Sequence, residues 1–343
     1  LDTVPTTELA AYEAYLMGRQ NILKRTVSDY EKALLQFQTA FSLDENFAGA
    51  YAGFCETHLS LYLQNSEVSH FKSAQTACEH ALTLDPDQAE VRVALGALYR
   101  NFGDYDRAEQ ELRKALESEP QNVDALIELG FTLALQGKVR EAEAVLLKAE
   151  SLQPEHWPVH DMLTHFYRVY ADQADRYERA VKYAMRTVEL TPENASAWNN
   201  LGTAYHSLQQ YDAAKAAWDR ALELHPTRTA YTNRGLQYYY EGRYADSAAM
   251  QMKAIELAPD DHRAWGRLAE SYRLMGDEDE AAVEAYASAI RLAEARLEIN
   301  GRDWRTKAML ATYYVHSNRG PEAVAMVEDA LADSEKAPEI LLY

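Results

Sequence analysis

Two pairs of polar side chains in the second half of the chain have the types and spacing to bind a peptide. Arg263 and Arg267 lie four residues apart, so on a helix they share a face and could together hold a carboxylate through charge-assisted hydrogen bonds. Asn200 and Asn233 each carry an amide that can both donate to and accept from a peptide backbone. These residues predict binding of an extended segment that is acidic or ends in a carboxylate. The alternative is that the arginines pair with Glu270 and nearby acids on a solvated face.

No set of residues predicts catalysis. The sequence lacks G-x-S-x-G, a phosphate-binding glycine loop, C-x-x-C and H-E-x-x-H. Asp161 and His165 lie four apart and could ligate a metal ion only with a third ligand from another helix, the alternative being a polar surface patch. We therefore expect no enzyme activity, no cofactor and no metal site.

The stretch from Ala195 to Pro226 indicates which elements position such residues. Residues that suit a helix core recur in two stripes, first Trp198, Leu201, Gly202 and Tyr205, then Ala214, Trp218 and Ala221. This pattern predicts two amphipathic helices in a hairpin, with Gly202 allowing close approach and Trp218 filling the space around it. One hairpin cannot bury both stripes, so it needs a neighbour on each side.

The neighbours are marked by prolines that recur every 33 to 38 residues, at positions 86, 120, 154, 192, 226 and 259. With this period and the W…L-G…Y…A…A…P pattern, the chain resembles the tetratricopeptide repeat family. The resemblance implies an all-α, right-handed α-solenoid forming a single domain over residues 1–343. We place its nine hairpins at about 8–45, 48–86, 89–120, 123–154, 157–192, 195–226, 228–259, 262–299 and 304–333, with 334–343 as a capping or truncated tail.

Three hairpins depart from the period by extra residues between their helices. The first turn is lengthened by about three residues near 24–28, the second by about seven at 62–69 and the fifth by about four near 171–175. These insertions are expected to share one edge of the solenoid, either as neutral drift or as binding loops. The second helix of the eighth hairpin should continue to Ile299, more than a turn longer than its predecessors.

In a stacked array of this kind the first helix of each hairpin lines the concave face. The predicted peptide-binding residues are those left on these helices once the core positions are removed. They are Asn199, Asn200, Thr203, His206, Asn233, Tyr239, Tyr240, Arg263, Arg267, Arg273 and Arg305. We expect this stripe to be exposed. Family members that clamp a C-terminal carboxylate carry Lys and Asn where Asn199 and Thr203 stand here, so a strict clamp is not predicted.

The corresponding face of the first half is predicted to be smaller and more apolar. It would be lined by Tyr15, Arg19, Gly49, Ala52, Glu56, Val93, Ala97, Ile127, Phe131 and Met162. A helix or a segment of the same chain could lie there.

Composition limits the partners. The chain carries 54 acidic and 34 basic residues, a net charge of -20, which disfavours nucleic acid and direct membrane contact. Cys55 and Cys78 fall on apolar stripes and are predicted to be buried free thiols. Since no apolar run spans a membrane and the chain starts at Leu1, we expect a fragment of a longer cytoplasmic protein, or of a periplasmic one if a membrane segment precedes it.

The first repeats, Ala10 to Thr26 and Phe47 to Phe54, resemble the C-terminal repeats of bacterial multidomain signalling proteins of the TolB-like, cyclase or winged-helix regulator type. The resemblance implies a non-catalytic protein–protein interaction module that binds a protein or peptide partner in its groove. The alternative is a structural spacer or a self-association unit, with a homodimer formed through the apolar tail.

Overall fold

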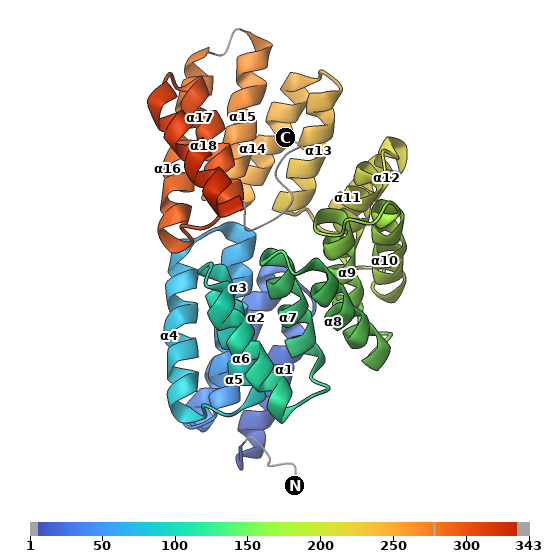
Figure 1. Ribbon diagram of the computed structural model, residues 1–343, viewed down its shortest axis with the longest axis vertical. Helices are drawn as coiled ribbons and strands as arrows, with labels where there is room; N and C mark the ends of the chain where they lie inside the picture. The colour runs from blue at the N-terminus through green and yellow to red at the C-terminus, as the bar shows by residue number, and fades with distance from the viewer. Residues whose placement is uncertain (1–5, 277–278, 335–343) are drawn as a thin grey trace. The chain divides into compact units, whose positions relative to one another are not determined.

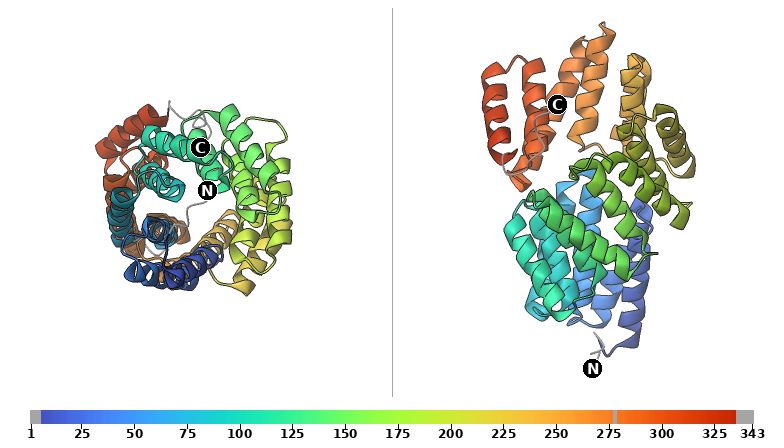
Figure 2. Two further views of the ribbon diagram at one scale, coloured as in Figure 1. Left: turned by 90° about the horizontal axis from the view of Figure 1, so that it is seen from below. Right: turned by 45° about the vertical axis from the view of Figure 1, so that its right-hand side comes forward.

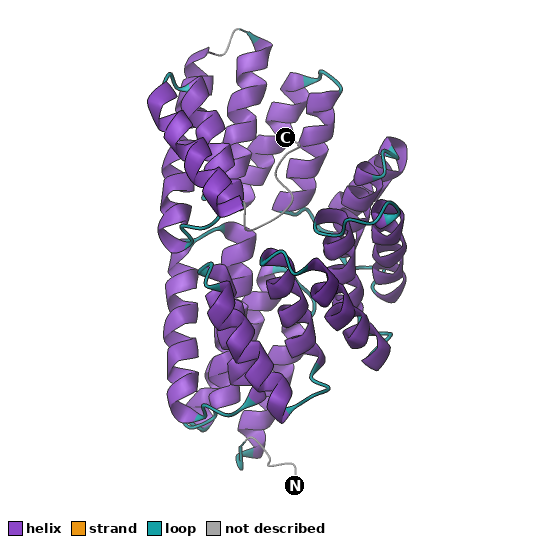
Figure 3. Ribbon diagram, viewed as in Figure 1, coloured by secondary structure: helices purple, strands orange, loops and turns teal. Residues whose placement is uncertain are grey.

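Helical hairpins account for all the regular structure in the part of the chain that the computed structural model describes, residues 6–276 and 279–334 (Figure 1 and Figure 3). The predicted all-α class is confirmed. The chain divides into two compact units, residues 1–154 and 155–343, and within each unit successive helices run in opposite directions (Figure 2). The tail predicted at 334–343 lies, apart from its first residue, outside the described residues.

The first unit contains four hairpins. Its helices are α1 (Leu9–Ile22), α2 (Val27–Leu43), α3 (Ala48–Asn65), α4 (Val68–Leu84), α5 (Ala89–Asn101), α6 (Tyr105–Ser118), α7 (Val123–Leu135) and α8 (Val139–Leu152). The first helices α1, α3, α5 and α7 contact one another in series, so they form one continuous face.

The described part of the second unit contains five hairpins. Its helices are α9 (Trp157–Val169), α10 (Arg176–Leu190), α11 (Ala195–Ser207), α12 (Tyr211–Leu224), α13 (Arg228–Tyr240), α14 (Tyr244–Leu257), α15 (His262–Met275), α16 (Asp279–Ile299), α17 (Trp304–His316) and α18 (Gly320–Ser334). Helix α16 has 21 residues, against 14 in α12 and α14, which confirms the predicted lengthening. Helices α9, α11, α13 and α15 contact one another in series.

Glycines on the first helices let large side chains of the second helices fill the hairpins. A Cβ added at Gly202 would lie 2.5 Å from the Trp218 ring, which is 2% exposed and donates its indole N–H to the Asn199 carbonyl. The predicted close approach at Gly202 is therefore confirmed, because no side chain fits between α11 and α12 at that level.

The two cysteines correct one expectation. Cys55 on α3 and Cys78 on α4 are both fully buried, as predicted, but they are joined in a disulfide and are not free thiols. Both lie on the facing stripes of one hairpin, so the packing that buries them also brings their sulfur atoms together.

The inserted residues of the second hairpin also behave differently from the prediction. They extend α3 and α4 to 18 and 17 residues, and only Ser66 and Glu67 separate the two helices. Ser66 has a φ of 63°, a left-handed conformation that ends α3 tightly. The prediction that the extra residues at 62–69 form a connection between the helices is therefore wrong. The fifth hairpin does carry a longer connection, from Tyr170 to Asp175.

Candidate binding surfaces

The predicted peptide-binding residues of the second unit lie on α11, α13, α15 and α17. Asn200, Asn233 and Arg267 are each the sixth residue of their helix, so they occupy equivalent positions on three successive hairpins. All three are half-buried. The expectation of a fully exposed stripe is therefore wrong for these positions.

The asparagines form a hydrogen-bonded chain across three hairpins. Asn200 Nδ2 donates to Asp161 Oδ1 at 2.6 Å, and Asn199 Nδ2 lies 3.4 Å from Asn200 Oδ1. Asn233 Nδ2 donates to Asn199 Oδ1 at 2.9 Å and to Thr203 Oγ1 at 3.2 Å. Asn199 is 5% exposed. These amides thus stabilise the packing between hairpins, and a peptide backbone would have to use the lone pairs and N–H groups that remain.

A cluster of arginines surrounds one buried carboxylate at the start of α15. Asp261 is fully buried and accepts hydrogen bonds from Arg228 Nη1 and from Arg263 Nε, the latter at 2.8 Å. It also caps α15 through the backbone N–H of Arg263. Burial alone would raise the pKa of Asp261, but the two guanidinium groups hold it well below its usual range. Arg263 is therefore already paired, and only the N–H groups that Asp261 does not use remain for a ligand.

Arg267 is in a different state from Arg263. Its guanidinium has no hydrogen-bond or ion-pair partner among the described residues. Burial and the neighbouring Arg263 lower the pKa of Arg267, and the negative charge of Asp261 opposes this shift. The Asp261 carboxylate is hydrogen-bonded to Arg228 and Arg263. A half-buried cation without a partner bears a desolvation cost that no counter-ion offsets.

Glu270 is the centre of a second polar cluster, on the same helix. It forms two hydrogen bonds with Arg273, of 3.0 and 2.6 Å, and accepts from Tyr286 at 2.7 Å and Tyr239 at 3.2 Å. Arg273 and Tyr286, against the effect of burial, lower the pKa of Glu270 to about 2. The alternative that Arg263 and Arg267 pair with Glu270 and nearby acids is confirmed in part: Arg263 pairs with the nearby Asp261, but Glu270 pairs with Arg273.

The remaining predicted residues form aromatic contacts. His206 stacks on Tyr240 with 6.2 Å between ring centroids, and burial lowers the pKa of its imidazole. Tyr240 is 67% exposed. Arg305 lies over the Trp304 ring at 4.3 Å, so it is held by a cation–π contact.

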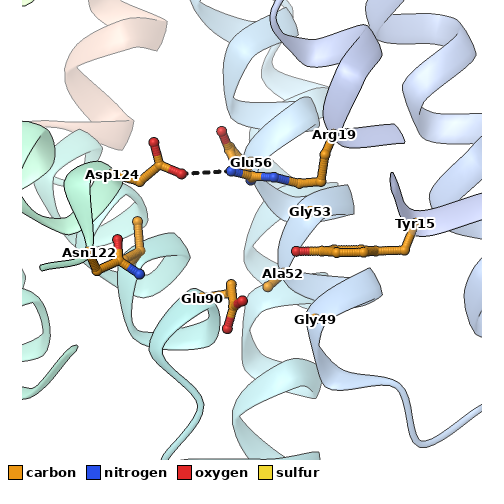
Figure 4. A pocket seen from close by; sticks show the side chains of 10 residues that line it. Tyr15, Arg19, Gly49, Ala52, Gly53, Glu56, Glu90, Asn122 and Asp124 are labelled. Atoms are coloured by element: carbon orange, nitrogen blue, oxygen red, sulfur yellow. Dashed lines mark hydrogen bonds and ion pairs between the residues drawn. The ribbon is translucent and has the colours of Figure 1, made fainter. Parts of the chain in front are cut away.

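The first unit presents a pocket on its row of first helices (Figure 4). The lining residues are Tyr15, Arg19, Gly49, Ala52, Gly53, Glu56, Glu90, Val93, Asn122 and Asp124. Six of them were predicted for this face, but Glu90, Asn122 and Asp124 were missed, and they make the pocket polar and acidic. The face predicted to be smaller and more apolar than that of the second half therefore carries more acidic groups than expected at this pocket. Glu90 and Asp124 each lie in the first turn of a helix. Acidic residues are common there because they interact favourably with the helix dipole, so the sequence alone did not mark them as pocket residues.

Arg19 connects distant hairpins across this pocket. Its guanidinium donates to Glu56 at 2.6 Å and to Asp124 at 2.7 Å, and Asp124 is 105 residues away in the sequence (Figure 4). Glu56 raises the pKa of Arg19, while burial and the nearby Asp124 raise the pKa of Glu56 against the effect of Arg19. The ion pairs fix α1, α3 and α7 relative to one another.

No group of three or more histidine, cysteine, aspartate or glutamate side chains is placed to hold a metal ion within residues 6–276 and 279–334. Asp161 instead accepts the hydrogen bond from Asn200. Among the helices of those two segments, none is sufficiently long and apolar to cross a membrane.

Two buried histidines are expected to make the stability depend on pH. His58 and His262 are 8% and 3% exposed, and burial lowers the pKa of each to about 4, with help from His70 and Arg263 respectively. Between the unfolded value of roughly 6.5 and 4, the unfolded chain binds more protons, so stability falls as pH falls. From pH 7 to pH 5 the loss should be about 2 kcal/mol per histidine.

Denaturant unfolding of the full chain at pH 7 and pH 5 measures this loss. His58→Gln and His262→Gln should each make the loss of unfolding free energy between pH 7 and pH 5 smaller. A pH dependence that is unchanged in both variants would contradict the assignment.

Comparisons with known proteins agree on the repeat. Family models described as "Tetratricopeptide repeat" match residues 68–117 and 102–164, 195–228, and 232–296, which together cover more than half of the chain. These matches fall in both units.

The curated relatives are large proteins that share only this region. The chain is 27% identical over 192 residues to human protein O-mannosyl-transferase TMTC1, covering 54% of the chain and 21% of the relative. It is 22% identical over 270 residues to human superkiller complex protein 3 (77% and 17%) and 24% identical over 298 residues to the bovine BBSome complex member BBS4 (84% and 52%). The chain thus spans about half or much less of the length of these relatives.

Solved structures with a similar fold include a human IFIT1 dimer with PPP-AAAA. It has a TM-score of 0.62 and 18% identity, and the match covers 96% of this chain and 73% of that one. A monomeric IFIT1 mutant with Gppp-AAAA has the same TM-score at 16% identity, with 94% and 71% covered. At this identity the likeness concerns the fold.

Proposed function

Because the chain belongs to the tetratricopeptide repeat family, whose repeats form protein-interaction or scaffold modules, we propose that it is a non-catalytic module that binds an extended acidic segment of a protein partner on the inner face of its second unit. The observation that carries this proposal is Arg267, a half-buried arginine without a partner among the described residues. Equivalent positions on the two preceding hairpins carry Asn200 and Asn233.

The charges of the arginine cluster favour an anion. Arg228 and Arg263 pair with the carboxylate of Asp261, whereas Arg267, beside Arg263, has no hydrogen-bond or ion-pair partner among the described residues and so presents a positive charge on a protein that is acidic overall. A carboxylate bound to Arg267 would gain a charge-assisted hydrogen bond and relieve the repulsion between the guanidinium groups. The exposed ring of Tyr240 lies close enough to Arg267 to influence its pKa and offers an apolar surface to the same segment.

A protein ligand is favoured over nucleic acid. The PPP-AAAA and Gppp-AAAA ligands of the IFIT1 structures are ligands of that protein. In this chain the net charge of -20 opposes the counterion-driven binding on which nucleic-acid affinity depends. The resemblance of the first repeats to bacterial signalling proteins supports a regulatory protein as the full-length context.

The proposal is tested by fluorescence anisotropy with the full chain and a labelled eight-residue peptide that carries three glutamates. The same peptide with glutamine in their place should bind on the order of tenfold more weakly, and Arg267→Met should weaken the acidic peptide by a similar factor. Raising the salt concentration should reproduce part of the loss.

Arg220→Met is the matched control. It removes the same charge from α12, a second helix, where Arg220 pairs with Glu223 at 3.2 Å. Equal weakening by Arg220→Met and Arg267→Met, or equal binding of the two peptides, would overturn the proposed site.

A further inference from the structure

The pocket of the first unit differs in charge from the arginine cluster. Arg19 is its one basic side chain, and three carboxyl groups, those of Glu56, Glu90 and Asp124, line it (Figure 4). Arg19 is bound to Glu56 and Asp124. Acidic side chains therefore outnumber basic ones in the lining of this pocket.

Glu90 is left without a cation. It is the second residue of α5, is half-buried, and has no hydrogen-bond or ion-pair partner among the residues that the structure describes. A half-buried carboxyl group is partly withdrawn from water, and a cation in contact with it would offset this.

Tyr15 gives a second, independent indication of a ligand. Its side chain is packed against Phe37 and Phe47, with ring centroids 5.9 and 5.1 Å away, and the residue is 9% exposed. Its hydroxyl has no hydrogen bond within the described residues and points into the pocket, on the side where Glu90 lies (Figure 4). The hydroxyl oxygen and its proton are therefore both available to a polar group that enters the pocket.

The size of the pocket selects the partner. It offers about 20 Å³ to groups of the size of a water molecule and is open to solvent. A lysine ammonium is a compact cation with three donors, whereas a guanidinium is a larger planar fork. The lining also contains Ala52 and Val93, against which an alkyl stem can lie.

We propose that this pocket receives the ammonium group of a lysine side chain from a partner protein. The ammonium donates hydrogen bonds to the Glu90 carboxylate and to the Tyr15 hydroxyl oxygen, and Arg19 keeps the other two carboxylates in place. The site is separate from the one under Proposed function and takes the opposite charge.

The test uses blocked lysine, Nα-acetyl-lysine N-methylamide, titrated into the isotope-labelled full chain while the backbone amides of Gly49 and Gly53 are followed by NMR. We expect saturable shifts with a dissociation constant on the order of millimolar. Blocked norleucine, which lacks the charge, should produce no saturable shift, and blocked arginine should bind more weakly than lysine. Stronger binding of putrescine than of blocked lysine would overturn the assignment to a protein side chain.

Variants locate the contact. Glu90→Gln should weaken blocked lysine on the order of tenfold, and Tyr15→Phe should weaken it severalfold without loss of folding stability, because the phenylalanine keeps the ring packing and removes only the unpaired hydroxyl. Glu13→Gln, which removes the same charge from an exposed position of α1, is the control and should leave the affinity unchanged. Equal effects of Glu13→Gln and Glu90→Gln, or a destabilised Tyr15→Phe variant, would overturn the proposal.

Discussion

Replacement of Asp261 by alanine is expected to lower the free energy of unfolding by about 3 to 5 kcal/mol, because it leaves a buried arginine without its counter-ion. Asp261 is fully buried, and the side chain of its partner Arg228 is 12% exposed. Burial and Arg263 lower the pKa of Arg228 to about 10 even with the carboxylate present. The variant also loses the N-cap of α15.

Denaturant unfolding followed by circular dichroism measures the loss. Asp261→Asn keeps the shape and the capping oxygen, so its loss should be smaller than that of Asp261→Ala. Asp260→Ala, at the less buried neighbouring position, serves as the control and should change stability by no more than about 0.5 kcal/mol. A cost below about 1 kcal/mol for Asp261→Ala would show that Arg228 is solvated and that the pair is not a buried one.

The hairpins were predictable because their core positions repeat. Gly202 and Trp218 lie on opposite helices at a spacing fixed by the repeat, so their contact depends only on the geometry of one hairpin. The same local logic places Asn200, Asn233 and Arg267 at equivalent positions.

The partners of these side chains were not predictable in the same way. Asn200 hydrogen-bonds to Asp161, 39 residues away, and Arg19 to Asp124, 105 residues away, and both contacts depend on how one hairpin stacks on the next. The pairing of Arg263 with Asp261 joins residues only two apart, at the start of α15. A periodic pattern assigns a residue to one face of its helix, but it does not predict which side chains of other hairpins that residue contacts.

Phe37 provides the second large expected effect. This side chain of α2 is fully buried and faces glycines of two helices at once. A Cβ added to Gly18 of α1 would lie 2.7 Å from its ring, and one added to Gly53 of α3 would lie 2.5 Å away. Phe37→Ala therefore opens a cavity between two hairpins and should cost about 3 to 5 kcal/mol of unfolding free energy.

A matched change on the same helix separates packing from helix propensity. Leu35 is 61% exposed on α2, so Leu35→Ala removes a large apolar side chain without forming a cavity. Its effect on the free energy of unfolding should stay within about 0.5 kcal/mol. Equal losses for Leu35→Ala and Phe37→Ala would refute the packing argument.

A double-mutant cycle then tests whether Gly53 is small because of the Phe37 ring. Alone, Gly53→Ala should destabilise the fold by about 1 to 3 kcal/mol, since its methyl group meets the ring. In the Phe37→Ala background the same change should be neutral or stabilising, because the cavity accepts the methyl group and alanine exceeds glycine in helix propensity by about 1 kcal/mol. The two changes should thus couple strongly. If the effects of the two changes on the free energy of unfolding simply add, contact with the Phe37 ring is not the reason for a glycine at position 53. In that case the close packing of α1 and α3 against α2 does not depend on Phe37.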